Sequence, residues 1–406
     1  MQQVLHLLIV DRDRRAALTA SYGSKWLLPV VTCAERARAA PVAARWAAER
    51  GAPGGVAGQW LGRVTEVGID WLVAIVARPP HFTPPPPLEW TPLDALSSQA
   101  SLLDYQQWAI ARAVQDDALP SVSGPFGNLS WPWDVQSWIG GAAGAAVSSL
   151  TPYRVGAYEV VLGADCLLGR VYFKGLVEER AAEARLTQAL AEAAPDSFAR
   201  TIALERQADG CVWWLTAACP GRPGGDPHRA AQALARVQQR TRTADHRSLV
   251  LPALDLEAAT RWASDLLGDS RSGAIVRRRC AQALHADVPT AWIPMDLDPV
   301  NILVDAGHRV RFIDVDDSFL GPAPLAMATL ARRSADPTLY RAYEQSWSPP
   351  LARLDWQDFE VAASVVESWL GWKRLRRNIE RGEVFAALDL VEARVRARLA
   401  RAINAE

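Results

Sequence analysis

The chain has 406 residues, of which 50% are hydrophobic and 22% are charged. This length predicts two or three domains and excludes a fibre or a disulfide-stapled miniprotein. The 44 lysines and arginines nearly balance the 45 acidic residues, so no global positive field attracts nucleic acid.

The cysteines and the apolar segments indicate the cellular compartment of the protein. Five cysteines lie far apart without C-x-x-C spacing, which argues against a disulfide framework or a zinc knuckle and favours a reducing compartment. The apolar residues 4–10 follow no basic segment and end at Asp11, so they predict a strand rather than a signal peptide. No apolar segment reaches the ~18 residues that cross a bilayer. We therefore expect a soluble, cytoplasmic protein that binds neither membrane nor nucleic acid.

Residues 1 to about 96 predict a small α/β unit. After the strand at residues 4–10, an Ala- and Arg-rich helix is expected at 34–50, followed by strands near 58–67 and 71–77. The run of four prolines at 84–87 is incompatible with a helix or a central strand and predicts a surface loop.

The landmarks of this region resemble those of a Nudix hydrolase domain: Trp26-x-x-Pro29, a helix ending at Glu49-Arg50-Gly51, and a closing Glu89-Trp90-x-Pro92-Leu93. The Nudix box R-E-U-x-E-E-x-G-U clusters glutamates because Mg²⁺ and pyrophosphate need carboxylates. Aligning the box on Gly51 places Arg45 and Ala48 at two glutamate positions and leaves only Glu49. The resemblance implies a degenerate domain without hydrolase activity that serves packing, substrate recognition or dimerisation. A generic α/β unit and an active hydrolase that depends on Glu49 are the alternatives.

The next 120 residues predict a connector and then a strand-rich segment. Residues 97–150 hold an expected helix at 101–115, a proline-containing loop and a cluster of Trp131, Trp133 and Trp138. Strands are then expected at 159–162, 169–174, 201–206 and 212–216, with a long helix at 178–193 and a Gly-Pro loop at 220–225. The rest of the chain is expected to be mostly helical, interrupted by one strand pair around residues 301–314.

The most informative stretch is Asp296-Leu297-Asp298-Pro299-Val300-Asn301, followed by a predicted hairpin and Asp314. Phosphoryl transfer from ATP needs a carboxylate near the attacking hydroxyl, an amide oxygen on a metal ion, and a second carboxylate that bridges Mg²⁺ to the phosphates. A loop followed by a hairpin supplies all three groups at these spacings. A turn with local side-chain caps is the plainer explanation of Asp296 and Asn301.

This stretch resembles the catalytic and metal-binding loops of the aminoglycoside phosphotransferase and choline kinase family, which has a protein-kinase-like fold. The family pattern is H-G-D-x-H-x-x-N, with I-D about a dozen residues later. The resemblance implies that Asp296 is the catalytic aspartate and that Asn301 and Asp314 are the Mg²⁺ ligands. The chain departs from the pattern at Pro294, Met295, Asp298 and Val300, and the downstream D-L-A aspartate is missing from residues 322–327.

A kinase-like lobe also needs a strand lysine for the ATP phosphates, paired with a glutamate on the next helix. Lys174 ends a predicted strand, and Glu183 lies nine residues later in the predicted helix. Lys174 precedes Asp296 by 122 residues (296 − 174), which is usual for this fold. Without the downstream motif, Lys174 and Glu183 would be an exposed ion pair worth ~0 to 1 kcal/mol.

Three further segments resemble parts of the same family. Residues 215–221 look like a hinge that ends in a Pro-Gly turn, which implies nucleotide contacts at Ala217 and Cys219, and residues 234–238 resemble the helix pattern l-A-x-l-Q. Residues 154–158 look like a reduced phosphate loop with one glycine where protein kinases have three, which assigns Arg154 and Gly156 to nucleotide binding.

An additional acidic set surrounds the predicted metal site: Asp298, Asp316 and Asp317. These residues either bind additional Mg²⁺ or a cationic acceptor, or they form a solvated loop.

We therefore expect an α+β protein. A degenerate Nudix-like α/β domain at 1–96 and a Trp-containing helical connector at 97–150 precede a two-lobed kinase-like domain, with an N-lobe at 151–220 and a helical C-lobe at 221–406. The implied activity is Mg²⁺-dependent transfer of the ATP γ-phosphate to a hydroxyl of a small molecule such as an aminoglycoside, sugar or nucleoside. The alternative is a pseudokinase or nucleotide-binding scaffold, and an oligomer would form through the N-terminal domain. Most of the 17 tryptophans are expected to anchor cores or interfaces rather than stack on a substrate.

Overall fold

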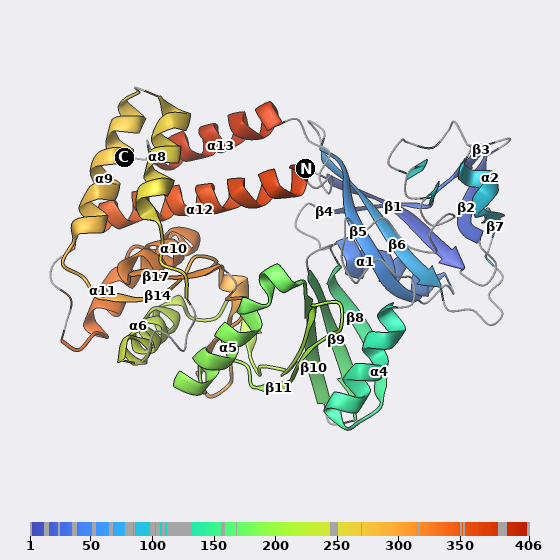
Figure 1. Ribbon diagram of the computed structural model, residues 1–406, viewed down its shortest axis with the longest axis horizontal. Coiled ribbons are helices and arrows are strands. Elements are labelled where there is room, and N and C mark those ends of the chain that lie inside the picture. The colour runs from blue at the N-terminus through green and yellow to red at the C-terminus, as the bar shows by residue number, and fades with distance from the viewer. Residues whose placement is uncertain are drawn as a thin grey trace. The chain divides into compact units, whose positions relative to one another are not determined.

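Helices and strands are mixed along the chain in the computed structural model, which confirms the predicted α+β class (Figure 1). The structure describes residues 2–11, 16–22, 25–34, 39–50, 54–64, 68–77, 84, 86–97, 102, 106–107, 110–111, 131–155, 159–167, 169–243, 251–268, 270–315, 317–349, 351, 354–380 and 388–403. The chain divides into two compact units. The first comprises Met1–Ala181, Thr201–Ala217 and Arg377–Ala386, and the second comprises Ala182–Arg200, Ala218–Arg376 and Ala387–Glu406.

The N-terminal sheet of the first unit is centred on β1 (Gln2–Asp11). This strand runs parallel to β6 (Gly68–Ala77) and antiparallel to β2 (Ala16–Tyr22) and β4 (Val30–Ala34). The strand order is β3-β2-β1-β6-β5, and the remaining strands are β3 (Lys25–Leu27), β5 (Gly54–Val64) and β7 (Leu88–Pro92), which pairs with β2. Leu7, Leu8 and Ile9 are all fully buried, so β1 is covered on both faces, as is typical of a strand with a parallel neighbour.

Helix α1 (Ala39–Glu49) packs against this sheet through Ala39, Ala43 and Ala47, which recur every four residues and are buried. The sequence predicted that this helix begins at residue 34, and that prediction is wrong. Ala34 is the last residue of β4 and pairs with Gln2 of β1. Sheet pairing overrides the helix preference of alanine at this position, because intrinsic propensity is a weak preference. A short helix, α2 (Leu93–Ser97), follows β7.

The second sheet of the first unit is antiparallel throughout, with the order β11-β12-β10-β9-β8. Its strands are β8 (Val147–Val155), β9 (Glu159–Cys166), β10 (Gly169–Leu176), β11 (Thr201–Arg206) and β12 (Val212–Ala217). The last four begin where the sequence predicted them, but β9 continues to Cys166 rather than ending at residue 162. Helix α4 (Trp131–Ala143) belongs to the same core, since the Trp138 ring lies 5.8 Å from Phe173 and 5.5 Å from Trp213.

The second unit is mainly helical. The predicted helix at 178–193 consists of a 3-10 turn, η2 (Glu178–Arg180), which lies in the first unit, and α5 (Ala182–Ala193). In the second unit, α8 and α9 lie side by side and α13 packs against both (Figure 1). The other helices are α6 (Pro227–Thr243), α8 (Leu256–Leu267), α9 (Arg271–His285), α10 (Pro324–Ser334), α11 (Leu339–Gln345), α12 (Trp356–Glu380) and α13 (Leu388–Ile403).

Two small sheets interrupt the helices of the second unit. The predicted strand pair is present as β15 (Ile302–Val304) and β16 (Val310–Phe312), and β13 (Arg222–Pro223) extends it on one side. A further pair, β14 (Thr290–Pro294) and β17 (Ser318–Pro322), was not predicted. The expectation of a single strand pair beyond residue 225 was therefore wrong. Short apolar strands of this kind cannot be told from helix segments by their sequence pattern.

All five cysteines are free thiols, as their scattered spacing predicted. Within the described part of the chain, no helix is both long enough and apolar enough to cross a membrane.

Candidate active site

Two backbone contacts bring the predicted catalytic and metal-binding segments together. In the first contact, β14 pairs with β17, and just beyond this pair the Met295 amide donates to the Asp317 carbonyl at 2.8 Å. In the second contact, β15 pairs with β16, and the Ile313 amide donates to the Asn301 carbonyl at 3.0 Å. Residues 295–301 and 313–317 therefore lie side by side, and both segments are tied to small sheets.

Asp296 lies two residues after the end of strand β14, and its side chain is 34% exposed. Its Oδ1 accepts a hydrogen bond from Arg333 Nη1 at 2.6 Å. The Asn301 amide nitrogen, Nδ2, donates to the Asp296 carbonyl at 3.1 Å and makes a longer contact of 3.5 Å with Oδ2. The two carboxylate oxygens thus face different partners.

Asn301 is buried at the end of the 3-10 turn η3 (Pro299–Asn301), with 7% of its surface exposed. The turn forms here because the Asp298 carboxylate caps it, accepting from the Val300 amide at 3.0 Å, and because proline suits the first helical position. A local side-chain cap is therefore present in this turn at Asp298, where none was predicted. That carboxylate also lies 3.6 Å from Arg333 Nη1, so its role as a substrate or metal ligand stays a prediction.

Asp314 follows β16 with a backbone φ of 58°, in the left-handed region that residues other than glycine seldom adopt. Such conformations cost of order 1–3 kcal/mol and concentrate at active sites, where the surrounding structure enforces them. The adjacent contact between Ile313 and Asn301 supplies this constraint. Asp314 therefore lies beside Asn301 in a conformation that is typical of functional residues.

Arg333 is a site residue that the sequence analysis missed. It lies on α10, and besides Asp296 it contacts Glu367 of α12, with Nε at 3.0 Å and Nη2 at 2.9 Å from Oε1. Because Arg333 follows Asp296 by 37 residues and belongs to no motif, no local pattern indicates this contact.

Of the remaining acidic residues, Asp317 is described and Asp316 lies outside the described residues. The Asp317 carboxylate forms an ion pair with Arg374 of α12 and is 24% exposed. It is therefore part of an ion pair with the protein itself, rather than a purely solvated group.

A buried amide supports the strands beneath this site. Gln238, within the predicted helix pattern at 234–238, is fully buried on α6. Its Nε2 donates to the carbonyls of Trp292 at 2.9 Å and Ala323 at 3.0 Å, and its Oε1 accepts from the Tyr343 hydroxyl at 2.6 Å. One amide thus joins β14 to the segment before α10, with every hydrogen-bonding group satisfied.

The predicted hinge turn packs on the hairpin formed by β15 and β16. Gly221 has a φ of 132°, and a Cβ on it would lie 2.9 Å from the Val304 carbonyl carbon, so only glycine fits. The Pro220 carbonyl accepts from Arg311 Nη1 at 3.4 Å. Nearby, burial raises the pKa of the Cys219 thiol, and the positive charge of Arg311 partly offsets this.

In the first unit, the predicted phosphate-binding residues lie on one face of the second sheet. Arg154 is opposite Val161, which is opposite Lys174 on the next strand, and residues that pair directly across strands share a face. Glu159 lies two residues before Val161 and therefore faces the same way.

Glu159 was not predicted, yet it is the centre of this group. Its side chain is only 3% exposed and lies among three cations. Arg180 Nη1 is 2.9 Å and Lys174 Nζ is 3.8 Å from Glu159 Oε2, and Arg154 forms an ion pair with Oε1. Three cationic side chains thus gather around one buried carboxylate on this side of the sheet.

Two further residues that were predicted to bind the nucleotide are Glu183, in the second unit, and Ala217, in the first. Glu183 lies in the first turn of α5 and is buried, and its pairing with Lys174 stays a prediction. Ala217 ends β12 and is partly buried. Gly156 lies outside the described residues, so the phosphate loop stays a prediction as well.

The donor chemistry at Asn301 and Asp314 fits Mg²⁺, which prefers hard oxygen ligands such as carboxylates and amide carbonyls. In the described parts of the chain, no group of three or more His, Cys, Asp or Glu is arranged to hold a metal ion. The predicted ligands are one carboxylate and one amide, a set that leaves most positions on a metal ion to phosphate oxygens and water.

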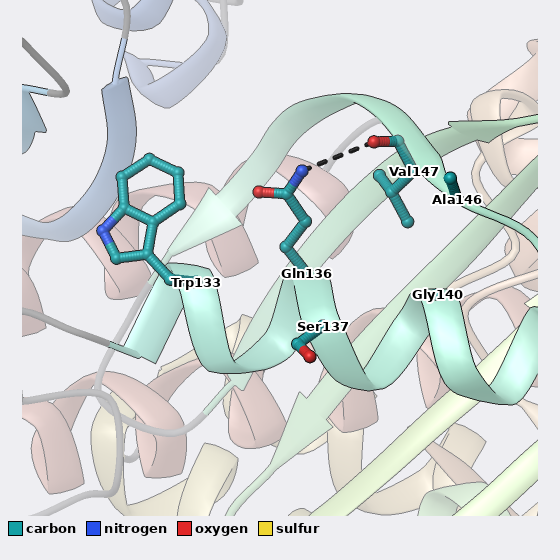
Figure 2. Close-up of a pocket in the computed structure, with 6 residues that line it drawn as sticks. All are labelled: Trp133, Gln136, Ser137, Gly140, Ala146 and Val147. Atoms are coloured by element: carbon teal, nitrogen blue, oxygen red, sulfur yellow. Dashed lines mark hydrogen bonds between the residues drawn. The ribbon is translucent and has the colours of Figure 1, made fainter.

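The first unit has a recess between α4 and β8 (Figure 2). Across it, Gln136 Nε2 donates to the Val147 carbonyl at 3.4 Å. The lining contains no titratable side chain, so this recess lacks groups for acid–base chemistry; it consists of Trp133, Gln136, Ser137, Gly140, Ala146 and Val147.

The N-terminal helix shows no carboxylate cluster of the kind that a Nudix hydrolase needs. Glu49, the single remaining glutamate of the box, has a side chain that is 62% exposed, 3.9 Å from Arg50 Nη1. Gly51 lies outside the described residues, and the Nudix resemblance is not confirmed.

Comparison with known proteins identifies a match in the region that holds the candidate site. A family model described as the phosphotransferase enzyme family matches residues 153–359, just over half of the chain. The matched region includes Lys174, Asp296, Asn301 and Asp314. A search of curated protein sequences finds no match.

Several solved structures are similar to this chain over most of their own length. A choline/ethanolamine kinase family protein from Mesorhizobium loti is 17% identical, with 63% of this chain and 88% of that chain covered and a TM-score of 0.46. A macrolide 2'-phosphotransferase from Brachybacterium faecium is 17% identical, with 68% and 99% covered and a TM-score of 0.46. A choline kinase from Streptococcus pneumoniae is 12% identical, with 68% and 99% covered and a TM-score of 0.49.

Proposed function

Because the chain belongs to the phosphotransferase enzyme family, we propose that it transfers the γ-phosphate of ATP to a hydroxyl group of a small molecule. The observation that carries this proposal is the arrangement of the two loops. The contacts of Met295 with Asp317 and of Ile313 with Asn301 hold Asp296, Asn301 and Asp314 on adjacent segments. One carboxylate, one amide and a second carboxylate are the groups that phosphoryl transfer requires.

We assign the role of base to Asp296. Arg333 occupies Oδ1 of this carboxylate, so Oδ2 accepts the proton of the attacking hydroxyl. A positioned base of this kind contributes about 10²- to 10⁴-fold to the rate. Asn301 and Asp314 would hold Mg²⁺, which supplies positive charge to the phosphate oxygens when it is bound.

The basic face of the second sheet is our candidate for the ATP phosphates. Lys174 and Arg154 lie on it, and the buried Glu159 limits the directions that their side chains can take. Glu183, Gly156, Ala217 and Cys219 complete the proposed nucleotide site on the basis of their positions in the family pattern. Asp298, Asp316 and Asp317 are proposed to lie near the acceptor.

The proposed function is tested by a thermal shift with ATP and by an assay of ADP release. We expect the full chain with Mg²⁺ to be stabilised against heating by ATP, because a ligand that binds only the folded state raises Tm. We also expect it to release ADP in the presence of at least one acceptor from a panel of aminoglycosides, sugars and nucleosides. Absence of any shift with ATP would contradict the proposal.

A nucleotide-binding pseudokinase is the second candidate. It is favoured by one observation: Asp296 already accepts a short hydrogen bond from an arginine, which competes with an acceptor for the carboxylate. This candidate predicts a thermal shift with ATP and no ADP release with any acceptor, so the same pair of assays separates the two functions.

A further inference from the structure

The guanidinium of Arg333 lies between the catalytic loop and helix α12. Nη1 is 2.6 Å from Asp296 Oδ1 and 3.6 Å from Asp298 Oδ2. On the opposite side, Nε and Nη2 lie 3.0 and 2.9 Å from Glu367 Oε1. Because a guanidinium is planar and its donors point in fixed directions, holding the edge at Glu367 also sets the direction of the edge at Asp296.

Glu367 is suited to be the anchor of this contact. Its side chain is 10% exposed, and it also forms an ion pair with Arg332, the neighbouring residue of α10. Arg333 is itself 25% exposed. Salt and water screen such partly buried pairs much less than surface pairs, so the orientation is held more firmly than at an exposed site.

The residues beside Asp296 give its carboxylate little other support. Pro294 and Met295 precede it in the chain, and neither side chain carries a hydrogen-bond donor. The Asn301 amide lies 3.5 Å from Oδ2, at the outer limit of a hydrogen bond. Among the described residues, Arg333 thus makes the shortest contact with this carboxylate.

We propose that Arg333 is a positioning residue for phosphoryl transfer: anchored by Glu367, it holds the Asp296 carboxylate so that Oδ2 faces the acceptor hydroxyl. This inference rests on the proposed function, because it takes Asp296 as the base. Arg333 acts through Asp296 and does not contact the acceptor or the nucleotide. Its removal leaves ATP binding intact and lowers the fraction of complexes in which the base is correctly oriented.

The first experiment measures kcat and KM for ATP hydrolysis by the full chain with Mg²⁺, with water as the acceptor. Arg333→Met is expected to lower kcat about 10- to 100-fold, because displacing a catalytic group by ~1 Å costs about 10²-fold. The KM for ATP is expected to change less than about twofold, since binding is not affected. An unchanged kcat in this variant would contradict the proposal.

Arg279→Met is the matched control. Arg279 also joins a helix to α12, with Nη1 2.8 Å from both Asp355 and Asp358, and both of these carboxylates lie outside residues 295–301 and 313–317. This variant is expected to lower Tm while keeping the wild-type kcat. If it lowers kcat as much as Arg333→Met does, general destabilisation explains both losses and the proposal is wrong.

Two further measurements separate positioning from a structural role. The double variant Asp296→Asn with Arg333→Met is expected to have the same kcat as Asp296→Asn alone, because Arg333 acts through the carboxylate that is already lost. Millimolar guanidinium ion is expected to restore kcat several-fold in Arg333→Ala and not in Asp296→Asn. Additive losses in the double variant, or no rescue, would overturn the inference.

The remaining outcomes are also distinct. A raised KM for ATP at unchanged kcat would assign Arg333 to phosphate binding and contradict a positioning role. If the wild-type chain shows no phosphate transfer, the proposed function fails and the inference fails with it. If the wild type turns over and Arg333→Met keeps its kcat, the inference alone fails.

Discussion

At the scale of single residues, the charged side chains of the candidate site are held by ion pairs with partners on other strands, turns and helices. Glu159 is nearly inaccessible and contacts three cations, and Asp296, in a loop, is held by Arg333 of helix α10. A buried charge is tolerated only when it is paired, because removal from water costs several kcal/mol per ion. These contacts therefore constrain the candidate site strongly, although no local pattern indicates them.

Glu159→Gln is expected to destabilise the protein by about 3–5 kcal/mol, since it leaves Lys174, Arg154 and Arg180 without their shared partner. Urea denaturation measures this loss. Glu192→Gln is the control, because Glu192 is exposed on α5, and we expect a change within about 0.5 kcal/mol there. A stability loss no greater than that of the control would show that Glu159 does not organise the cluster.

Asp305, in the hairpin formed by β15 and β16, is expected to make the stability of the protein depend on pH. Hydrogen bonds from the Arg309 amide, and then from the Arg309 and Arg311 side chains, lower its pKa to about 2. A lowered folded-state pKa means that the carboxylate stabilises the fold above the ordinary value of 3.8, and that this contribution is lost as pH falls toward 2. Asp305→Asn is thus expected to be less stable than wild type at pH 7, with a smaller difference at pH 2.5. A difference that stays constant across this range in thermal melts would contradict the assignment.

At the scale of elements, regular patterns were predictable and long-range pairings were not. Strands at 159–162 and 169–174 could be predicted because their apolar residues alternate, although the observed strands continue to Cys166 and Leu176. The hairpin near Asn301 could be predicted because a family motif surrounds it. The pairing of β14 with β17 joins residues more than 20 positions apart and has no turn signal between them. Arg333 reaches Asp296 in the same way, across 37 residues. Such contacts are decided by packing, which no local sequence window contains.

The turn at Gly221 offers a prediction at this scale. Gly221→Ala is expected to cost more than about 1 kcal/mol, because the residue has positive φ and the new Cβ would meet the Val304 backbone. Gly141→Ala is the matched control in α4, where no heavy atom lies within 4 Å of the added Cβ. We expect that variant to be about 0.5–1 kcal/mol more stable, since alanine favours a helix. Equal effects of the two substitutions in chemical denaturation would contradict this account of the turn.

At the scale of the whole molecule, the family match includes the candidate site and does not reach the N-terminal sheet. The match covers residues 153–359, and residues before 153 lie outside it. The core of the first unit includes Leu5 and Val73 of the N-terminal sheet as well as Val155 and Phe173 of the second sheet. We propose that the domain at 1–96 and the connector at 97–150 serve packing, before an N-lobe at 151–220 and a C-lobe at 221–406.

The central claim is that Asp296 is the base of a phosphotransferase, and the Asp296→Asn variant tests it most directly. The substitution keeps the shape of the side chain and removes the proton acceptor. The measurement is the rate of ADP formation by the full chain with ATP and Mg²⁺, alongside the thermal shift that ATP causes. We predict a fall in kcat of at least about 10²-fold with the thermal shift retained. A variant that keeps the wild-type kcat would contradict the claim.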